Sequence, residues 1–170
     1  MHEDETTLSP CLVVGFAGGA MQLMSVPRHE FVKGVGEVCE CDRLFLMDPD
    51  QSWYLNDPER RWNGLAFHRE LLCTFTARYE HVMFVGNCLG AVGVCLFAEY
   101  CDYALAFNPQ TDPMNDPRRK YRIGAARVPR AIRENILRLL NEGIRACTGT
   151  VEVHVTAGIP AEVRSAPAGR

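Results

Sequence analysis

"FVGNCLGA", residues 84–91, is the stretch that decides the fold, because it joins two apolar segments through a turn that carries a cysteine between two glycines. The segment before the turn, "HVMFVGN" (81–87), is rich in β-branched and aromatic residues and predicts a buried strand. The segment after it, "LGAVGVCLFAEYC" (89–101), is almost entirely apolar and predicts a buried helix. A buried strand that turns directly into a buried helix indicates an α/β domain.

Cys88 is the residue at the centre of this turn, with Gly86 two positions before it and Gly90 two positions after it. G-x-C-x-G between a strand and a helix matches the strand–turn–helix known as the nucleophile elbow, with cysteine in place of serine. The glycines leave room for the helix to pass close to the strand. The turn also puts Cys88 at a helix N-terminus, whose partial positive charge favours a thiolate. The plainer alternative is that Cys88 is a buried small residue in a sheet-to-helix turn.

The rest of the chain repeats the alternation of strand and helix, with long crossovers between the strands. This alternation is typical of a sheet whose two faces are covered by helices. We therefore predict an α/β fold with a mostly parallel sheet of about five strands and helices on both faces. The predicted strands are 11–20, 41–48, 81–87, 103–109 and 150–156, and the predicted helices are 60–79, 89–101 and 130–144, with a weaker helical signal at 31–38.

A single domain is predicted over residues 11–157. The acidic segment 1–10 and the Ala-, Pro-, Gly- and Arg-rich tail 158–170 show no structural periodicity, so we predict that both are disordered. Residues 108–129 are polar and hold four prolines, which indicates a long loop of the kind that often carries function.

Composition and charge exclude several classes of protein. The 170 residues are 47% hydrophobic and 23% charged, with a net charge of −3, so neither nucleic acid nor an anionic membrane is an expected partner. The start, "MHEDETTLSP", shows no signal or transit peptide, and no apolar run approaches the ~20 residues of a membrane span. These features predict a cytoplasmic globular protein.

The eight cysteines are the unusual feature of the composition. Cys39 and Cys41 stand one residue apart, too close for C-x-x-C spacing, and no nearby histidine completes a zinc site, so no metal or other cofactor is expected. Without a secretory signal, a disulfide framework is the weaker interpretation. We interpret the cysteines other than Cys88 as small buried hydrophobes in a reducing compartment.

A second glycine turn ends the first predicted strand. Gly18 and Gly19 in "GFAGGA" would bring backbone N–H groups close to a substrate carbonyl, like the oxyanion loop after an early strand of a hydrolase. The N–H of Leu89, the residue after the nucleophile, would be the second donor. A tight turn at the strand end is the equally good plain interpretation of the two glycines.

Four segments in register give the chain a resemblance to α/β-hydrolase-fold proteins, over roughly residues 11 to 112. It is similar to a group that reads about "F-G-G" after the first strand, "RDLxQxWY" after the next, "FxGNSMGGYAA" at the elbow and "AFSPQT" beyond it. The corresponding segments here are "FAGG" (16–19), "MDPDQSWY" (47–54), "FVGNCLGAVG" (84–93) and "AFNPQT" (106–111).

Loops that follow parallel strands meet at one edge of the sheet, so we expect Asp48, Gln51 and Trp53 on the rim beside Cys88. The alternative for Trp53 is that it caps the core. A triad of this fold runs nucleophile, acid, histidine, and Asp112 is the predicted acid.

The predicted base is missing. His154 is the last histidine of the sequence and falls inside a short predicted strand, whereas the base of this fold follows a further strand. His68 and His81 precede Cys88 in the sequence, and we predict that His68 lies on a helix surface and that His81 starts a strand. Three explanations stay open: a truncated sequence, a degenerate relative, or a base borrowed from elsewhere.

Two functions are therefore predicted as alternatives. The first is an esterase- or thioesterase-type acyl hydrolase, or an acyltransferase, that attacks a small acyl or ester substrate through Cys88. The second is a non-catalytic α/β-hydrolase-like domain that binds a ligand or partner in the same crevice.

Overall fold

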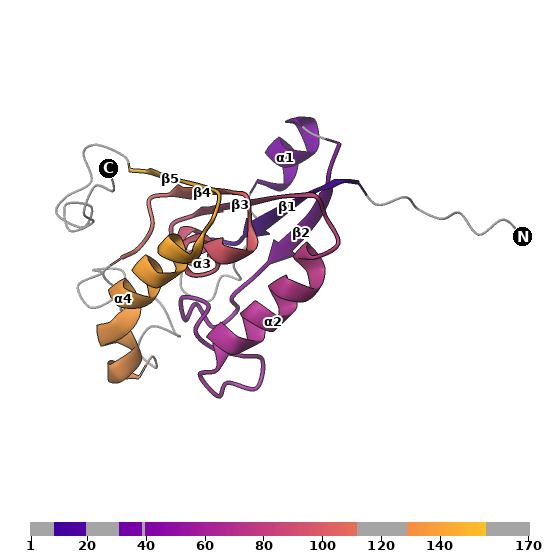
Figure 1. The fold of residues 1–170 in the computed structure, drawn as a ribbon. Coiled ribbons are helices and arrows are strands. Elements are labelled where there is room, and N and C mark those ends of the chain that lie inside the picture. The colour runs from indigo at the N-terminus through magenta and orange to yellow at the C-terminus, as the bar shows by residue number, and fades with distance from the viewer. Residues whose placement is uncertain (1–8, 20–30, 39, 112–128, 156–170) are drawn as a thin grey trace, which may run out of the picture.

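The computed structural model describes residues 9–19, 31–38, 40–111 and 129–155, and a five-stranded sheet forms the centre of this part of the chain (Figure 1). The strand order is β2-β1-β3-β4-β5, and every neighbouring pair is parallel. This confirms the predicted α/β class and the predicted parallel sheet. The strands are β1 (Cys11–Phe16), β2 (Asp42–Leu46), β3 (His81–Asn87), β4 (Tyr103–Phe107) and β5 (Thr150–His154).

Helices cover both faces of the sheet: α1 lies on one face, and α2, α3 and α4 lie on the other (Figure 1). The direction of the crossovers explains this division. The chain runs from β1 to β2 one way, then crosses back to β3 and continues outward through β4 to β5. Right-handed crossovers in opposite directions place their helices on opposite faces. The helices are α1 (Val32–Val38), α2 (Gly64–Thr76), α3 (Leu89–Leu96), the 3₁₀ turn η1 (Ala98–Tyr100) and α4 (Arg130–Ala146).

The larger core lies between the sheet and the three helices α2, α3 and α4. Phe16 is at its centre, with ring centroids 5.4 Å from Tyr54 and 5.3 Å from Phe84, both in edge-to-face geometry. Gly93 of α3 allows this packing, because a Cβ there would lie 2.6 Å from the ring of Phe16. The end of β1 is therefore fixed against α3 from one side.

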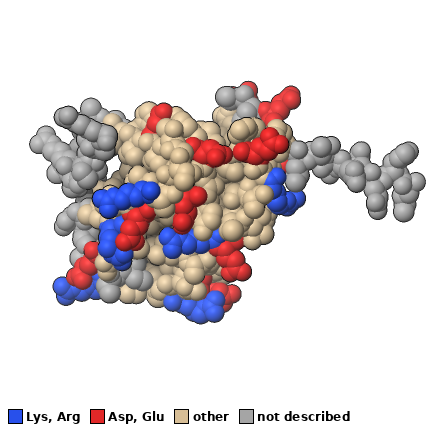
Figure 2. Space-filling view, viewed as in Figure 1, with Lys and Arg blue, Asp and Glu red and all other residues tan. Residues whose placement is uncertain are grey.

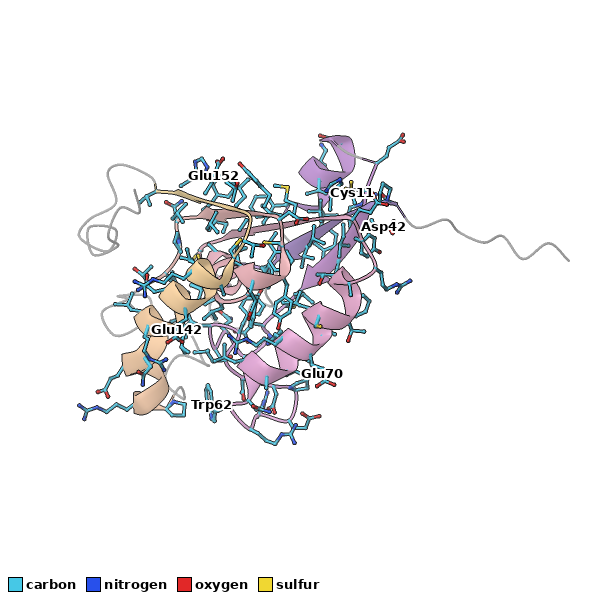
Figure 3. The ribbon with its side chains drawn as sticks, viewed as in Figure 1. Cys11, Asp42, Trp62, Glu70, Glu142 and Glu152 are labelled. Carbon is cyan, nitrogen blue, oxygen red and sulfur yellow. The ribbon has the colours of Figure 1, made fainter. Side chains whose placement is uncertain are left out.

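The smaller core lies under α1 and contains the buried residues Val13, Cys41 and Val85. Successive strand residues point to opposite faces, so β4 and β5 also present side chains here. The hydroxyl of Tyr103 donates a hydrogen bond to Glu152 on this face. Figure 3 shows Glu152 on the α1 side of the sheet.

Most element boundaries lie inside the predicted ones. The helix predicted at 60–79 begins only at Gly64, because the residues before it form turns held by side chains. The Asp57 carboxylate accepts the N–H of Arg61 at 2.6 Å, and the Asn56 side chain accepts the N–H of Trp62 at 3.0 Å. The helix predicted at 89–101 also ends early, and η1 follows it.

Charged side chains of both signs alternate on the face shown in Figure 2, over α2 and α4. On α4 they form i,i+4 pairs, Arg130 with Glu134 and Arg138 with Glu142. Such exposed pairs contribute little to stability. Among the described residues, no helix combines the length and the apolar character that crossing a membrane requires.

Candidate functional site

The strand order creates a topological switch point between β1 and β3 at the carboxyl end of the sheet. β1 and β3 are parallel neighbours, but the chain leaves β1 toward β2 and leaves β3 toward β4. Ligands of open α/β sheets bind at such a switch point, outside the carboxyl ends of the strands. Phe16 pairs with Gly86 in the register of β1 and β3, so the loop after Phe16 and the turn at Cys88 leave the sheet side by side.

Cys88 occupies the turn between β3 and α3 in a backbone conformation that non-glycine residues rarely adopt. Its φ is 56° and its ψ is −111°, and it is the N-cap residue of α3. Such a conformation costs of order 1–3 kcal/mol and persists only when the surroundings hold it. The N–H of Cys88 donates to the carbonyl of Phe107 at 2.8 Å, and its own carbonyl accepts the N–H of Gln110 at 3.4 Å. The half-buried cysteine is thus held at a strained turn by the end of β4.

The two flanking glycines are required by close backbone contacts. A Cβ on Gly86 would lie 2.5 Å from the carbonyl carbon of Gly90, and a Cβ on Gly90 would lie 2.2 Å from the carbonyl oxygen of Phe16. Real Cβ atoms do not approach so closely, so these are positions at which only glycine fits. The first turn of α3 therefore packs directly on the ends of β3 and β1.

The residues predicted as oxyanion donors lie at the same edge. Gly18 is buried and Gly19 half-buried, and both belong to the loop that follows β1. Leu89 is the first residue of α3 and is fully buried. The N–H groups of the first helical residues are not used inside a helix, so they are available to an oxygen atom at the turn. The contact of these groups with a substrate stays a prediction.

Asp48, predicted on the neighbouring rim, organises the loop that follows β2. Its buried carboxylate accepts the N–H of Ser52 at 2.5 Å, the hydroxyl of Ser52 at 3.2 Å and the N–H of Tyr54 at 2.9 Å. Burial raises the pKa of Asp48 to about 6, although these hydrogen bonds act in the opposite direction. This role of Asp48 was not predicted, although an Asp ahead of a Ser in a Pro-containing turn is a signal for it.

The side chains of Gln51 and Trp53 are turned into the protein. Trp53 is fully buried, which favours the interpretation that it caps the core. Its contact with a ligand stays a prediction. Gln51 is 9% exposed, and its buried Oε1 has no hydrogen-bond partner in the part of the chain that the structure describes. Tyr54 then joins this loop to the glycine loop, because its hydroxyl donates to the carbonyl of Ala17 at 2.8 Å.

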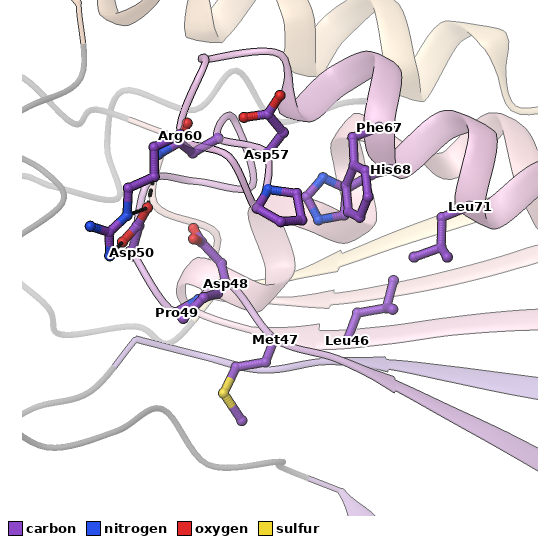
Figure 4. Close-up of a pocket in the computed structure, with 12 residues that line it drawn as sticks. Leu46, Met47, Asp48, Pro49, Asp50, Asp57, Arg60, Phe67, His68 and Leu71 are labelled. Atoms are coloured by element: carbon purple, nitrogen blue, oxygen red, sulfur yellow. Dashed lines mark hydrogen bonds and ion pairs between the residues drawn. The ribbon is translucent and has the colours of Figure 1, made fainter.

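A pocket of about 340 Å³ opens between this loop and α2 (Figure 4). Its wall includes the carboxylates of Asp48, Asp50 and Asp57, but protein donors already bind each of them. The pocket wall also contains His68, whose Nδ1 lies 2.8 Å from the carbonyl of Gly64. The three carboxylates and the imidazole of this wall therefore each have a partner within the protein.

The described histidines lie in three different environments. His68 is buried, and burial lowers its pKa, so the prediction that it lies on the helix surface is wrong. His81 is the first residue of β3, as predicted, and it therefore lies at the edge opposite Cys88. His154 ends β5 instead of lying inside a strand; its Nε2 is 3.1 Å from a carboxylate oxygen of Glu152, and its ring is 5.1 Å from that of Phe107.

Asp112, the predicted acid, lies outside the described residues. Within the described part of the chain, no group of three or more His, Cys, Asp and Glu side chains is arranged to hold a metal ion. The chain matches no protein-family model, and it has no match among curated proteins. The fold is therefore assigned as α/β, and what the site does is argued from its geometry.

Proposed function

We propose that this chain is an α/β-hydrolase-like acyl-transfer protein in which Cys88 is the nucleophile. The observation that carries the proposal is the conformation of Cys88, with φ 56° and ψ −111° at the N-terminus of α3. A residue that only filled space between a strand and a helix would have no reason to retain this strain. The strand order supports the proposal, because this turn lies at the topological switch point, where α/β proteins commonly bind ligands.

The proposed reaction begins with attack of the Cys88 thiolate on the carbonyl carbon of an ester or thioester. The new C–S bond forms a tetrahedral intermediate, whose oxyanion accepts hydrogen bonds from the N–H groups of Leu89 and Gly19. The bond to the leaving group then breaks, the leaving group takes a proton from solvent, and Cys88 keeps the acyl group as a thioester. Transfer to an acceptor or hydrolysis by an activated water completes the cycle.

A non-catalytic binding domain is the second candidate, and the positions of the histidines favour it. In the described part of the chain, His154 is the histidine at the carboxyl edge of the sheet, but it packs on Phe107 and pairs with Glu152. No described histidine follows a strand on a loop, as the base of a hydrolase does. In this alternative the same crevice binds an acyl ligand without turning it over.

Competitive labelling of two cysteines tests whether Cys88 is activated. Cys73 is exposed on α2, whereas Cys88 is half-buried at the turn and therefore less accessible. Accessibility alone thus predicts faster labelling of Cys73. The native chain is treated with a limiting amount of a chloroacetamide, and the modified residues are mapped by mass spectrometry. The proposal predicts that Cys88 is modified at least tenfold faster than Cys73, and that this preference disappears in urea. Labelling in the order of exposure would reject an activated Cys88.

A further inference from the structure

Cys101 and Cys147 meet at the edge of the sheet opposite Cys88. Cys101 lies two residues before β4, and Cys147 is the C-cap residue of α4, shortly before β5. The two residues are 46 positions apart in sequence, yet the thiol of Cys147 donates to the carbonyl oxygen of Cys101 at 3.7 Å. The thiol of Cys101 donates to the carbonyl oxygen of Ala98 at 3.4 Å.

The backbone around this pair holds the two cysteines close together. The N–H of Thr150 donates to the carbonyl of Asp102 at 2.9 Å. A Cβ on Gly149 would lie 1.9 Å from the same carbonyl oxygen, so the two chain segments approach as closely as a glycine allows. The pairing of β4 with β5 therefore fixes how close the two backbone segments lie, and a disulfide requires the Cys101 thiol to turn from Ala98 toward Cys147 until the sulfurs are ~2.05 Å apart.

We propose that Cys101 and Cys147 form an intramolecular disulfide on oxidation, a modification site that ties the start of β4 to the end of α4. This inference is independent of the proposed function of Cys88. It also departs from the expectation that the cysteines other than Cys88 are simple hydrophobes.

The two thiols have different roles in the exchange. Cys147 is half-buried and Cys101 is buried, so an oxidant reaches Cys147 first. With a small disulfide such as oxidised glutathione, the Cys147 thiolate forms an S–S bond to one sulfur and releases the first glutathione thiol. Cys101 then attacks the sulfur of Cys147 and releases the second. Two electrons pass from the protein thiols to glutathione, and the two thiol protons end on the released glutathiones.

The second step is expected to be the slow one. Burial, followed by the neighbouring Cys147, raises the pKa of Cys101 well above its usual value, so little thiolate is present at neutral pH. The rate of disulfide formation should therefore increase steadily with pH, while the glutathione adduct on Cys147 accumulates transiently.

Digestion at glutamate separates this pair from the other cysteines. Cleavage after Glu99, Glu134, Glu142 and Glu152 leaves Cys101 alone in residues 100–134 and Cys147 alone in residues 143–152. The native full-length chain is incubated with oxidised glutathione, alkylated and digested without reduction. We expect these two peptides to be linked, with a mass about 2 Da below their sum. The same oxidation in urea should give mixed pairings, because the pairing depends on the fold.

Two variants complete the test. Cys147→Ser should remove the linked peptides, whereas Cys73→Ser, which changes an exposed cysteine of α2, should leave their yield unchanged. Thermal melting of the oxidised wild type should shift to higher temperature, since the link constrains the unfolded chain. The inference is overturned if wild-type Cys147 stops at the glutathione adduct while Cys101 stays alkylatable, or if either cysteine pairs elsewhere in the native chain. The wild-type mapping decides this even if a variant does not fold.

Discussion

At the scale of single residues, the site depends on one strained cysteine and on two glycines that give it room. The strained cysteine and its two glycines were predicted from the sequence, because the G-x-C-x-G pattern places small residues where a tight strand-to-helix turn needs them. The sequence did not predict that Gln51, Trp53 and Tyr54 also have positive φ, between 49° and 61°. Those residues carry no glycine-like signal, and the hydrogen bonds that enforce their conformation come from a folded loop.

The strain at Cys88 predicts an unusual effect of glycine. Cys88→Gly should be more stable than Cys88→Ala by about 1 kcal/mol, because glycine adopts positive φ at little cost. The measurement is the free energy of unfolding in urea. At Cys73, inside α2, the order should reverse, with glycine less stable than alanine by about 1 kcal/mol. If alanine were the more stable residue at both positions, the turn at Cys88 would not be strained.

Gly90 is predicted to tolerate no side chain. Gly90→Ala should lower the free energy of unfolding by about 1–3 kcal/mol, because its Cβ would lie 2.2 Å from the carbonyl oxygen of Phe16. Gly34→Ala is the matched control: a Cβ there meets nothing within 4 Å, and alanine in place of glycine in α1 should add about 0.4–1 kcal/mol. Equal stability of the two variants in urea would contradict the close approach of α3 to β1.

At the scale of elements, the sequence predicted the presence of every strand and helix better than their ends. Hydrophobic runs locate strands because they report burial, but they do not report where side chains take over the backbone hydrogen bonds. The clearest example is the loop after β2, where the Asp48 carboxylate accepts the backbone N–H groups of Ser52 and Tyr54. In a strand or helix, backbone carbonyls would accept these hydrogen bonds. His68 was misplaced for a related reason: a polar residue on a helix suggests exposure, and its backbone partner Gly64 is visible only in the fold.

Asp48 makes the stability of this loop depend on pH. Its pKa is raised by burial from 3.8 to about 6, so its contribution to stability is complete below pH 3.8 and is lost as the pH rises through about 6. Relative to Asp48→Asn, the wild type should gain up to roughly 3 kcal/mol in free energy of unfolding between about pH 7.5 and about pH 4. Urea titrations of both proteins at the two pH values measure this difference.

The comparison with Asp48→Asn also removes the opposite effect of His68. Burial lowers the pKa of His68, so its contribution is present above its ordinary pKa and is lost as the pH falls. Both proteins carry His68, and this term cancels in their difference. If the difference in free energy of unfolding between the wild type and Asp48→Asn stayed constant across the pH range, Asp48 would have an ordinary pKa in the folded chain.

At the scale of the whole molecule, the strand order brings the glycine loop after β1 and the cysteine turn after β3 side by side at one edge of the sheet. The sequence predicted the parallel sheet, because the strands alternate with long crossovers. The same topology separates the histidines. His81 starts β3 at the amino edge of the sheet, His154 ends β5 at the carboxyl edge, and His68 of α2 lies buried in the core. The proposed nucleophile and an incomplete set of acid–base partners therefore coexist in the described part of one fold.

This arrangement predicts acylation without efficient turnover. Cys88 lies at a strained turn at a helix N-terminus, so we expect it to react with an activated ester and release about one equivalent of product per chain. Release of the acyl group needs a water activated by a general base, and the three described histidines lie in the core, at the opposite edge and against the Glu152 carboxylate. We expect a burst followed by a stalled acyl-enzyme, visible as the added acyl mass on the intact chain and absent in Cys88→Ala. Sustained turnover that depends on Cys88 would instead reveal a base, and substitution of His154, His68 and His81 in turn would locate it among the described histidines.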